Sequence, residues 1–194
     1  MAKVFAVVCI FVGIGVAAYL HLRRDMAGVE GVAGAGLHMP AASTAGAAAP
    51  EGKSGFIGNT GYLLEFPGTH DAQASMEGET ELVYFFLKGA QPTADESKYK
   101  ELGMVRLEVT PPPMHQGKPV GMDEMKKVVL FTLEGNKETA AAKDVALPLT
   151  GFMIDITAPK PIKQLFVRGK KVMYMFTGAD AELMLSLAGS IKEN

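Results

Sequence analysis

The residues of this sequence best suited to chemistry are one histidine and five carboxylates within a short segment. They are Glu65, His70, Asp71, Glu77, Glu79 and Glu81. Imidazole and carboxylate groups ligate divalent cations, so the segment is a hypothetical metal site. Its spacing matches no metal-binding loop, however, and we favour the interpretation that it is a solvated acidic loop.

Thr69, His70 and Asp71 place the residue types of a hydrolytic triad in a row. Nucleophilic catalysis needs a hydroxyl beside a histidine that a carboxylate orients, whereas consecutive side chains usually point apart. The single cysteine, Cys9, lies in an apolar run, so residues 54–194 contain neither a thiol nucleophile nor a disulfide. His115 follows three prolines and is interpreted as an exposed loop residue. We therefore expect no enzyme activity, no metal site and no cofactor.

Five positive charges surround an expected hairpin in the last third of the chain: Lys160, Lys163, Arg168, Lys170 and Lys171. One hypothesis is a docking face for anionic lipid headgroups or an acidic partner. The other, which we favour, is a solvated edge hairpin whose lysines prevent pairing with other chains. Residues 54–194 carry 15 Lys and Arg against 18 Asp and Glu, so we expect no nucleic-acid partner, since phosphate backbones require a basic face.

An uncharged apolar run at residues 4–20 lies between Lys3 and the pair Arg23 and Arg24. As a helix it is roughly 25 Å long, near the short end of what crosses a hydrocarbon core of about 30 Å. We predict a single-pass membrane anchor within residues 1–25, with residues 4–22 in the bilayer. The alternative is a signal peptide cleaved after the small residues at 16–18.

The charges flanking this run are balanced, so the positive-inside rule does not decide the orientation. Residues 26–53 are rich in Ala and Gly and show no helical or strand periodicity, which is typical of a flexible linker with a reach on the order of 30 Å. Its small-residue, largely uncharged character favours an extracytoplasmic position for the domain that follows. His38 and Met39 are interpreted as incidental linker residues and not as a soft-metal pair.

Residues 54–194 are predicted to form one α+β domain, a mostly antiparallel sheet flanked by helices. The expected strands are 61–67, 81–88, 103–110 and 151–157, followed by a hairpin at 164–177, and the first expected helix is 122–134. The strand at 81–88 is apolar on both faces and should lie inside the sheet. In the strand at 103–110, Val105, Leu107 and Val109 alternate with Arg106, Glu108 and Thr110, so one face is expected in water.

The expected C-terminal unit is a hairpin followed by a helix. Gly169 is expected to give the hairpin turn its positive φ. Thr177 and Asp180 resemble a capping box that opens the helix. The helix should bury Leu183, Met184, Leu187 and Ile191. Met173 and Met175 share one strand face and are interpreted as core-filling residues.

The order of these elements resembles the PsbP-like α/β sandwich superfamily. The resemblance is carried by the opening Gly61-Tyr62 and Phe66-Pro67, by the strand at 171–176, and by a final helix ending at Ser190-Ile191-Lys192. It extends from Gly55 to Asn194 and carries over no individual functional residue. It implies a non-catalytic accessory or binding domain.

The sequence thus predicts a membrane-anchored, exported domain that binds a protein or envelope partner without catalysing a reaction. The alternative is a small-ligand or lipid-binding domain with an apolar pocket between helix and sheet.

Overall fold

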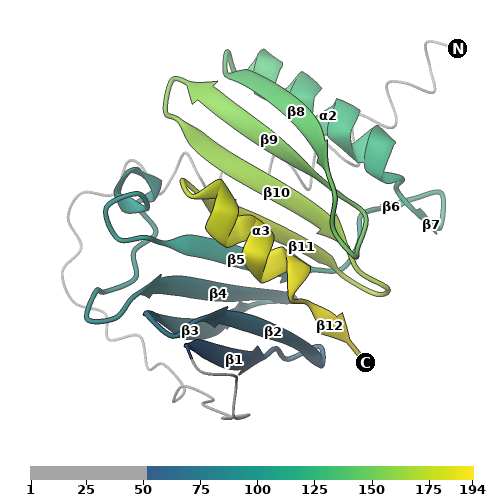
Figure 1. The fold of residues 1–194 in the computed structure, drawn as a ribbon. Helices are drawn as coiled ribbons and strands as arrows, with labels where there is room; N and C mark the ends of the chain where they lie inside the picture. The colour runs from purple at the N-terminus through teal and green to yellow at the C-terminus, as the bar shows by residue number, and fades with distance from the viewer. Residues whose placement is uncertain (1–51) are drawn as a thin grey trace, which may run out of the picture.

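The computed structural model describes residues 52–194 (Figure 1). The predicted anchor, almost all of the predicted linker, Cys9, His38 and Met39 lie outside the described residues. Lys53, which we had assigned to the linker, is the first residue of a strand. Neither helix within 52–194 is long and apolar enough to cross a membrane.

The main element is a seven-stranded sheet in which every neighbouring pair is antiparallel. Its strand order is β3-β4-β5-β11-β10-β9-β8. The strands are β3 (His70–Glu77), β4 (Thr80–Leu87), β5 (Val105–Thr110), β8 (Thr139–Val145), β9 (Gly151–Ala158), β10 (Ile162–Arg168) and β11 (Met173–Gly178).

A second, three-stranded sheet joins the first described strand to the last, in the order β1-β2-β12. Its strands are β1 (Lys53–Ile57), β2 (Tyr62–Pro67) and β12 (Lys192–Glu193). The remaining elements are the β6 (Met114–His115) and β7 (Lys118–Pro119) hairpin, a 3-10 turn η1 (Glu96–Lys98), and the helices α2 (Met122–Gly135) and α3 (Ala181–Gly189). The predicted α+β class, a mostly antiparallel sheet with helices, is confirmed.

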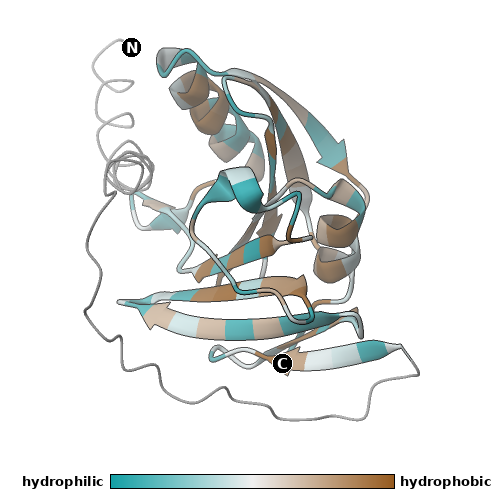
Figure 2. Ribbon diagram, turned by 90° about the vertical axis from the view of Figure 1, so that its left-hand side faces the viewer, coloured by the Kyte–Doolittle hydropathy of each residue, from teal (hydrophilic) through white to brown (hydrophobic). Residues whose placement is uncertain are grey.

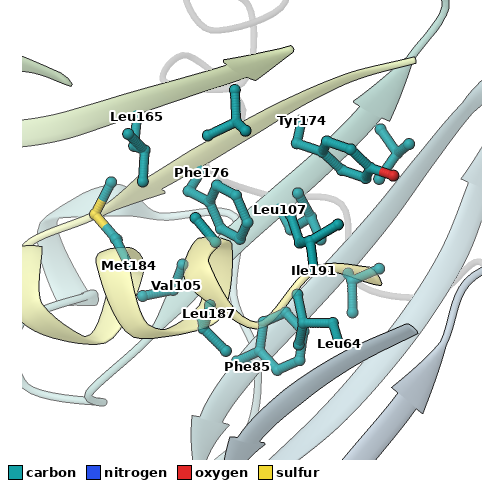
Figure 3. Close-up of a cluster of buried hydrophobic side chains, with 14 of the residues drawn as sticks. Leu64, Phe85, Val105, Leu107, Leu165, Tyr174, Phe176, Met184, Leu187 and Ile191 are labelled. Carbon is teal, nitrogen blue, oxygen red and sulfur yellow. The ribbon is translucent and has the colours of Figure 1, made fainter. Parts of the chain in front are cut away.

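One face of the seven-stranded sheet packs against α3 and the small sheet. Because strand side chains alternate between faces, Leu107 of β5 and Phe176 of β11 point to the same side. Figure 3 shows Met184, Leu187 and Ile191 facing them, and all five side chains belong to one buried cluster. The predicted burial of Leu187 by the last helix is therefore confirmed.

The opposite face is covered by α2 over β8 and β9, and by the segment that carries η1 over β4 and β5. Figure 2 shows α2 and η1 on one side of the sheet and α3 on the other. Met125, Val129 and Leu133 of α2 are buried at helical spacing, as the sequence predicted. Met173 and Met175 pack in the same cluster, which confirms their interpretation as core residues.

The expectation that one face of β5 lies in water is wrong. Arg106 is 7% exposed and Glu108 is 8% exposed, although both point away from the α3 face. The segment between β4 and β5 crosses this face, and Glu96 from η1 contacts the Arg106 guanidinium at 3.3 Å. The alternating pattern was identified correctly, but a distant segment covers its polar side.

The C-terminal hairpin also differs from expectation in two respects. Its strands β10 and β11 lie in the middle of the sheet, so it is not an edge hairpin. The φ of Gly169 is not positive. A Cβ at this position would lie 2.1 Å from Glu193 Oε1, so glycine is required here for close approach and not for turn geometry.

The last helix begins and ends at other residues than predicted. Asp180 is itself the N-cap, and its carboxylate accepts the N–H groups of Glu182 and Leu183. Thr177 is a buried residue of β11 and takes no part in the cap. The helix ends at Gly189, so Ile191 lies in the connection to β12, where it is still buried.

Candidate functional site

The candidate site is a notch of about 170 Å³ at the corner where the two sheets meet. We call it the corner notch. Its lining residues come from the β1–β2 turn, from β2, from the turn after β10, from β11 and from the chain around β12: Thr60, Tyr62, Lys170, Lys171, Val172, Tyr174, Glu193 and Asn194. It therefore exists only in the folded domain, because these segments are far apart in the sequence.

Strand pairing positions the aromatic side of the notch. Tyr62 of β2 pairs with Glu193 of β12, and its ring contacts the ring of Tyr174 edge to face at 5.2 Å between centroids. Both tyrosines are 1% exposed. A Cβ at position 58 would lie 1.9 Å from the Tyr62 ring, so Gly58 allows the β1–β2 turn to close over it. Close packing therefore fixes the position of the Tyr62 ring at this corner.

Glu193 connects β12 to the seven-stranded sheet. Its carboxylate accepts the Lys170 main-chain N–H, at 2.9 Å to Oε2, and the Tyr174 hydroxyl, at 2.9 Å to Oε1. Burial, and then this hydrogen bond, raise the pKa of Tyr174 above its ordinary value. Both oxygens of the Glu193 carboxylate thus accept a hydrogen bond within the protein.

Glu81 makes the reciprocal connection, from the seven-stranded sheet to the small one. This carboxylate is 2% exposed and accepts the Asn59 N–H at 3.0 Å. Burial raises the pKa of Glu81, and the Asn59 hydrogen bond opposes the rise. Burial also raises the pKa of Tyr62, with a further contribution from the nearby Glu81 charge. The Tyr62 hydroxyl makes no hydrogen bond within the described residues.

Of the five predicted basic residues, the structure brings only Lys170 and Lys171 to the notch. Arg168 donates a hydrogen bond to the Val120 carbonyl, and Lys163 pairs with Asp155 at 2.9 Å. Lys160 lies before β10, whereas Lys170 and Lys171 lie after it. The length of this strand, about 23 Å, therefore separates Lys160 from the other two lysines. The five charges do not form one face.

The acidic segment of the sequence is not a loop but spans β2, β3 and β4. Glu65 pairs with Lys53 at 3.3 Å and with Lys192 at 3.5 Å, whereas Glu81 is buried under the β1–β2 turn. Glu77 and Glu79 are exposed at the β3–β4 turn. Within residues 52–194 no group of three or more His, Cys, Asp and Glu side chains is arranged to hold a metal ion.

His70 is buried, and its Nδ1 lies 3.0 Å from Thr69 Oγ1, so these two consecutive side chains do meet. Asp71 is exposed on the other side of β3, away from this pair. His115 is half-buried in the short β6 strand.

A second polar cluster surrounds Arg106. Its guanidinium contacts the carboxylates of Glu108, at 2.7 Å, and of Glu96. Tyr99 is 1% exposed beside it, and burial raises its pKa. Burial also raises the pKa of Glu108, although the adjacent guanidinium opposes this shift. A shallow depression of about 150 Å³ lies next to this cluster, lined by Gln73, Ser75, Tyr84, Pro92, Thr93 and Ala94. The cluster fastens the η1 segment to the sheet.

No family model and no curated protein matches this chain. The function is therefore argued from the geometry of the corner notch and from the sequence pattern.

Sequence reasoning identified Lys170 and Lys171 but missed Thr60, Tyr62 and Glu193 as members of a site. The clue available for Tyr62 was its place in an apolar strand, which indicates burial and not binding. Glu193 gave no signal, because its role depends on pairing between β12 and β2.

Proposed function

We propose that this protein is a membrane-anchored, exported accessory domain that binds an anionic partner at the corner notch and does not catalyse a reaction. The observation that carries the proposal is the state of two lysines. Lys170 and Lys171 are adjacent, exposed and line one notch, and neither has a carboxylate in ion-pair contact within the described residues, although the Lys170 ammonium lies 3.5 Å from the Glu193 carbonyl oxygen. Lys127 and other exposed lysines of this part of the chain also lack an ion pair, but the notch brings two such charges together in one hollow. Two neighbouring charges without a paired carboxylate are available to an external anion.

The membrane part of the proposal rests on the apolar run at residues 4–20 and on the linker composition. The linker that the sequence predicts would hold the domain at an effective concentration on the order of millimolar near its membrane. Each lysine close to an anionic surface contributes about 1 kcal/mol. A weak site with two lysines is therefore sufficient for a tethered domain.

The resemblance to the PsbP-like superfamily supports the same proposal, because it implies an accessory domain. The alternative function requires an apolar pocket between helix and sheet. In the described part of the chain, Met184, Leu187 and Ile191 lie between α3 and the sheet (Figure 3), so no observation favours that alternative.

The test uses the full chain with an N-terminal tag, expressed in membranes and extracted with a mild detergent. We expect an anionic component to co-purify with the parent protein and to be lost at high salt. Charge reversal at Lys170→Glu and Lys171→Glu together should abolish its retention, because like charges then face each other.

The matched control is Lys127→Glu, which reverses an exposed charge on α2, away from the notch. The control should retain the component. Equal retention by all three proteins would refute binding at the notch. Release of the parent protein from membranes by a carbonate wash would refute the anchor.

A further inference from the structure

We propose that the corner notch binds a phosphate group. This inference rests on the proposed function, because both place the partner at Lys170 and Lys171. It goes further by naming the chemical group that the notch recognises.

The balance of donors and acceptors in the notch points to an anion. Glu193 is the one carboxylate among the lining side chains, and it already accepts the Lys170 N–H and the Tyr174 hydroxyl. Two lysine ammonium groups and the Thr60 hydroxyl add exposed donors. The Lys170 ammonium reaches the Glu193 carbonyl oxygen at 3.5 Å, whereas Lys171 makes no hydrogen bond from side chain or main chain within the described residues. Among the lining side chains two positive charges thus face one carboxylate, which favours a ligand that carries negative charge and accepts hydrogen bonds.

The arrangement of these donors favours phosphate over carboxylate. Lys170 and Lys171 lie on the turn after β10, whereas Thr60 lies on the β1–β2 turn, which belongs to the other sheet. Donors that approach from two sides suit a ligand whose oxygens point in several directions. A phosphate monoester has three such oxygens and a charge of about −1.5 to −2 at neutral pH, whereas a carboxylate has two oxygens in one plane and a single charge.

The size of the notch limits what else it holds. Its volume of about 170 Å³ is below the roughly 300–1,000 Å³ of pockets that enclose whole cofactors or drug-sized ligands. The bound group is therefore free phosphate or a lipid headgroup that ends in a phosphate monoester and projects into the notch. Both sources present the same chemistry to the same two lysines.

The first experiment measures thermal unfolding of the full chain in a neutral detergent, by circular dichroism, in sodium phosphate and in sodium chloride of equal ionic strength. A ligand at ten times its dissociation constant raises the midpoint by about 4 °C for a domain of this size. We expect that rise for the parent protein and for Lys171→Arg, which keeps the charge and the capacity to bind phosphate.

Lys171→Gln should lose the phosphate-dependent rise while keeping the parent midpoint in chloride, because Lys171 makes no contact on which the fold depends. Lys127→Gln, on α2, is the matched control and should keep the full rise. Equal midpoints of the parent in phosphate and chloride would overturn the proposal, as would an unchanged rise in Lys171→Gln.

The second experiment distinguishes the two sources through the acetylation rate of Lys171 relative to Lys127. The full chain is reconstituted in vesicles of phosphatidylcholine, with and without phosphatidic acid, whose headgroup is a phosphate monoester. Roughly fivefold slower acetylation of Lys171 with phosphatidic acid, which corresponds to about 1 kcal/mol, assigns the headgroup as the source. The same slowing by inorganic phosphate alone assigns the free ion.

No slowing in either condition would overturn the phosphate site. The co-purification test with Lys170→Glu and Lys171→Glu separates this result from the proposed function. If that variant still lost the co-purifying component, the notch would bind an anionic group other than phosphate, and the proposed function would stand. If phosphate bound but the variant retained the component, the proposed function would fail and the phosphate site would stand.

Discussion

The two faces of β5 bury their residues by different means. Val105, Leu107 and Val109 pack in the apolar cluster under α3, where the driving force is removal of apolar surface from water. On the opposite face Arg106 and Glu108 are almost equally buried, but their burial depends on charge pairing beneath the η1 segment. An apolar cluster tolerates loss of one member at a graded cost, whereas a buried ion cluster leaves an uncompensated charge when one member is removed. The faces should therefore respond differently to substitution.

Arg106→Leu tests the charged face and should have the largest effect. It leaves the carboxylates of Glu96 and Glu108 close together under the η1 segment without their shared cation, which should cost about 3–5 kcal/mol of unfolding free energy. Chemical denaturation of the detergent-solubilised chain measures this cost. The double variant with Glu108→Leu should recover part of it, because one unpaired carboxylate is then removed.

The control for this variant is Lys163→Leu on β10, which removes a cation from a partly exposed ion pair. It should cost less than about 1 kcal/mol. Similar losses for both variants would show that burial beneath the η1 segment does not make the Arg106 ion cluster more costly to break than a partly exposed ion pair.

Leu187→Ala tests the apolar face. Leu187 is 0% exposed, and its truncation should reduce the unfolding free energy by about 2–5 kcal/mol through lost burial and a residual cavity. Ser186→Ala, at an exposed position of the same helix, should stay within about 0.5 kcal/mol. A melt of Leu187→Ala that coincides with the parent would mean that α3 is not docked on the sheet.

Glu81→Gln tests the buried carboxylate at the corner and should have the smallest effect at neutral pH. Burial raises the folded-state pKa of Glu81 above its ordinary value of 4.5, so the folded protein holds this proton more tightly than the unfolded chain. Its contribution to stability is therefore most favourable at acidic pH and decreases as pH rises through the window between 4.5 and the raised value. The amide cannot ionise, yet its oxygen can still accept the Asn59 N–H.

Glu81→Gln should therefore be neutral or slightly stabilising at neutral pH, and the gain should disappear at acidic pH. Unfolding midpoints measured across this range for the parent and the variant give the comparison. A variant that is less stable than the parent at neutral pH and equal at acidic pH would reverse the predicted sign.

Periodicity predicted the helices and most central strands because burial on one face is recorded directly in the sequence. The spacing of Leu183 and Leu187 is such a record, and so is the alternation in β5. Both edge strands of the seven-stranded sheet escaped prediction. β3 contains His, Gln, Ser and two acidic residues, and β8 is rich in alanine, so neither shows strand periodicity. They are strands because β4 and β9 pair with them, which is a property of the tertiary fold.

The candidate site was predictable only in part for the same reason. Lys170 and Lys171 adjoin a recognisable turn, so their charge was visible in the sequence. The partners that shape the notch, Tyr62 and Glu193, are joined by strand pairing across most of the domain. The ion pairs of Arg106 were equally hidden in the sequence, since Glu96 belongs to a segment without regular periodicity.

The pairing of β12 with β2 has a consequence for how the chain reaches its native state. Ser190 Oγ accepts the Glu65 N–H at 2.9 Å and donates to the Glu65 carbonyl at 3.0 Å, and the Asn194 amide donates to the Gly61 carbonyl at 2.9 Å. These contacts have a sequence separation of 125 and 133 residues. A topology with so many non-local contacts folds slowly, since loop closure precedes the gain from pairing. During synthesis the β1–β2 hairpin emerges before the other described elements but acquires its third strand last. The open edge of β2 remains available to chaperones, or to aggregation, until residues 190–194 arrive.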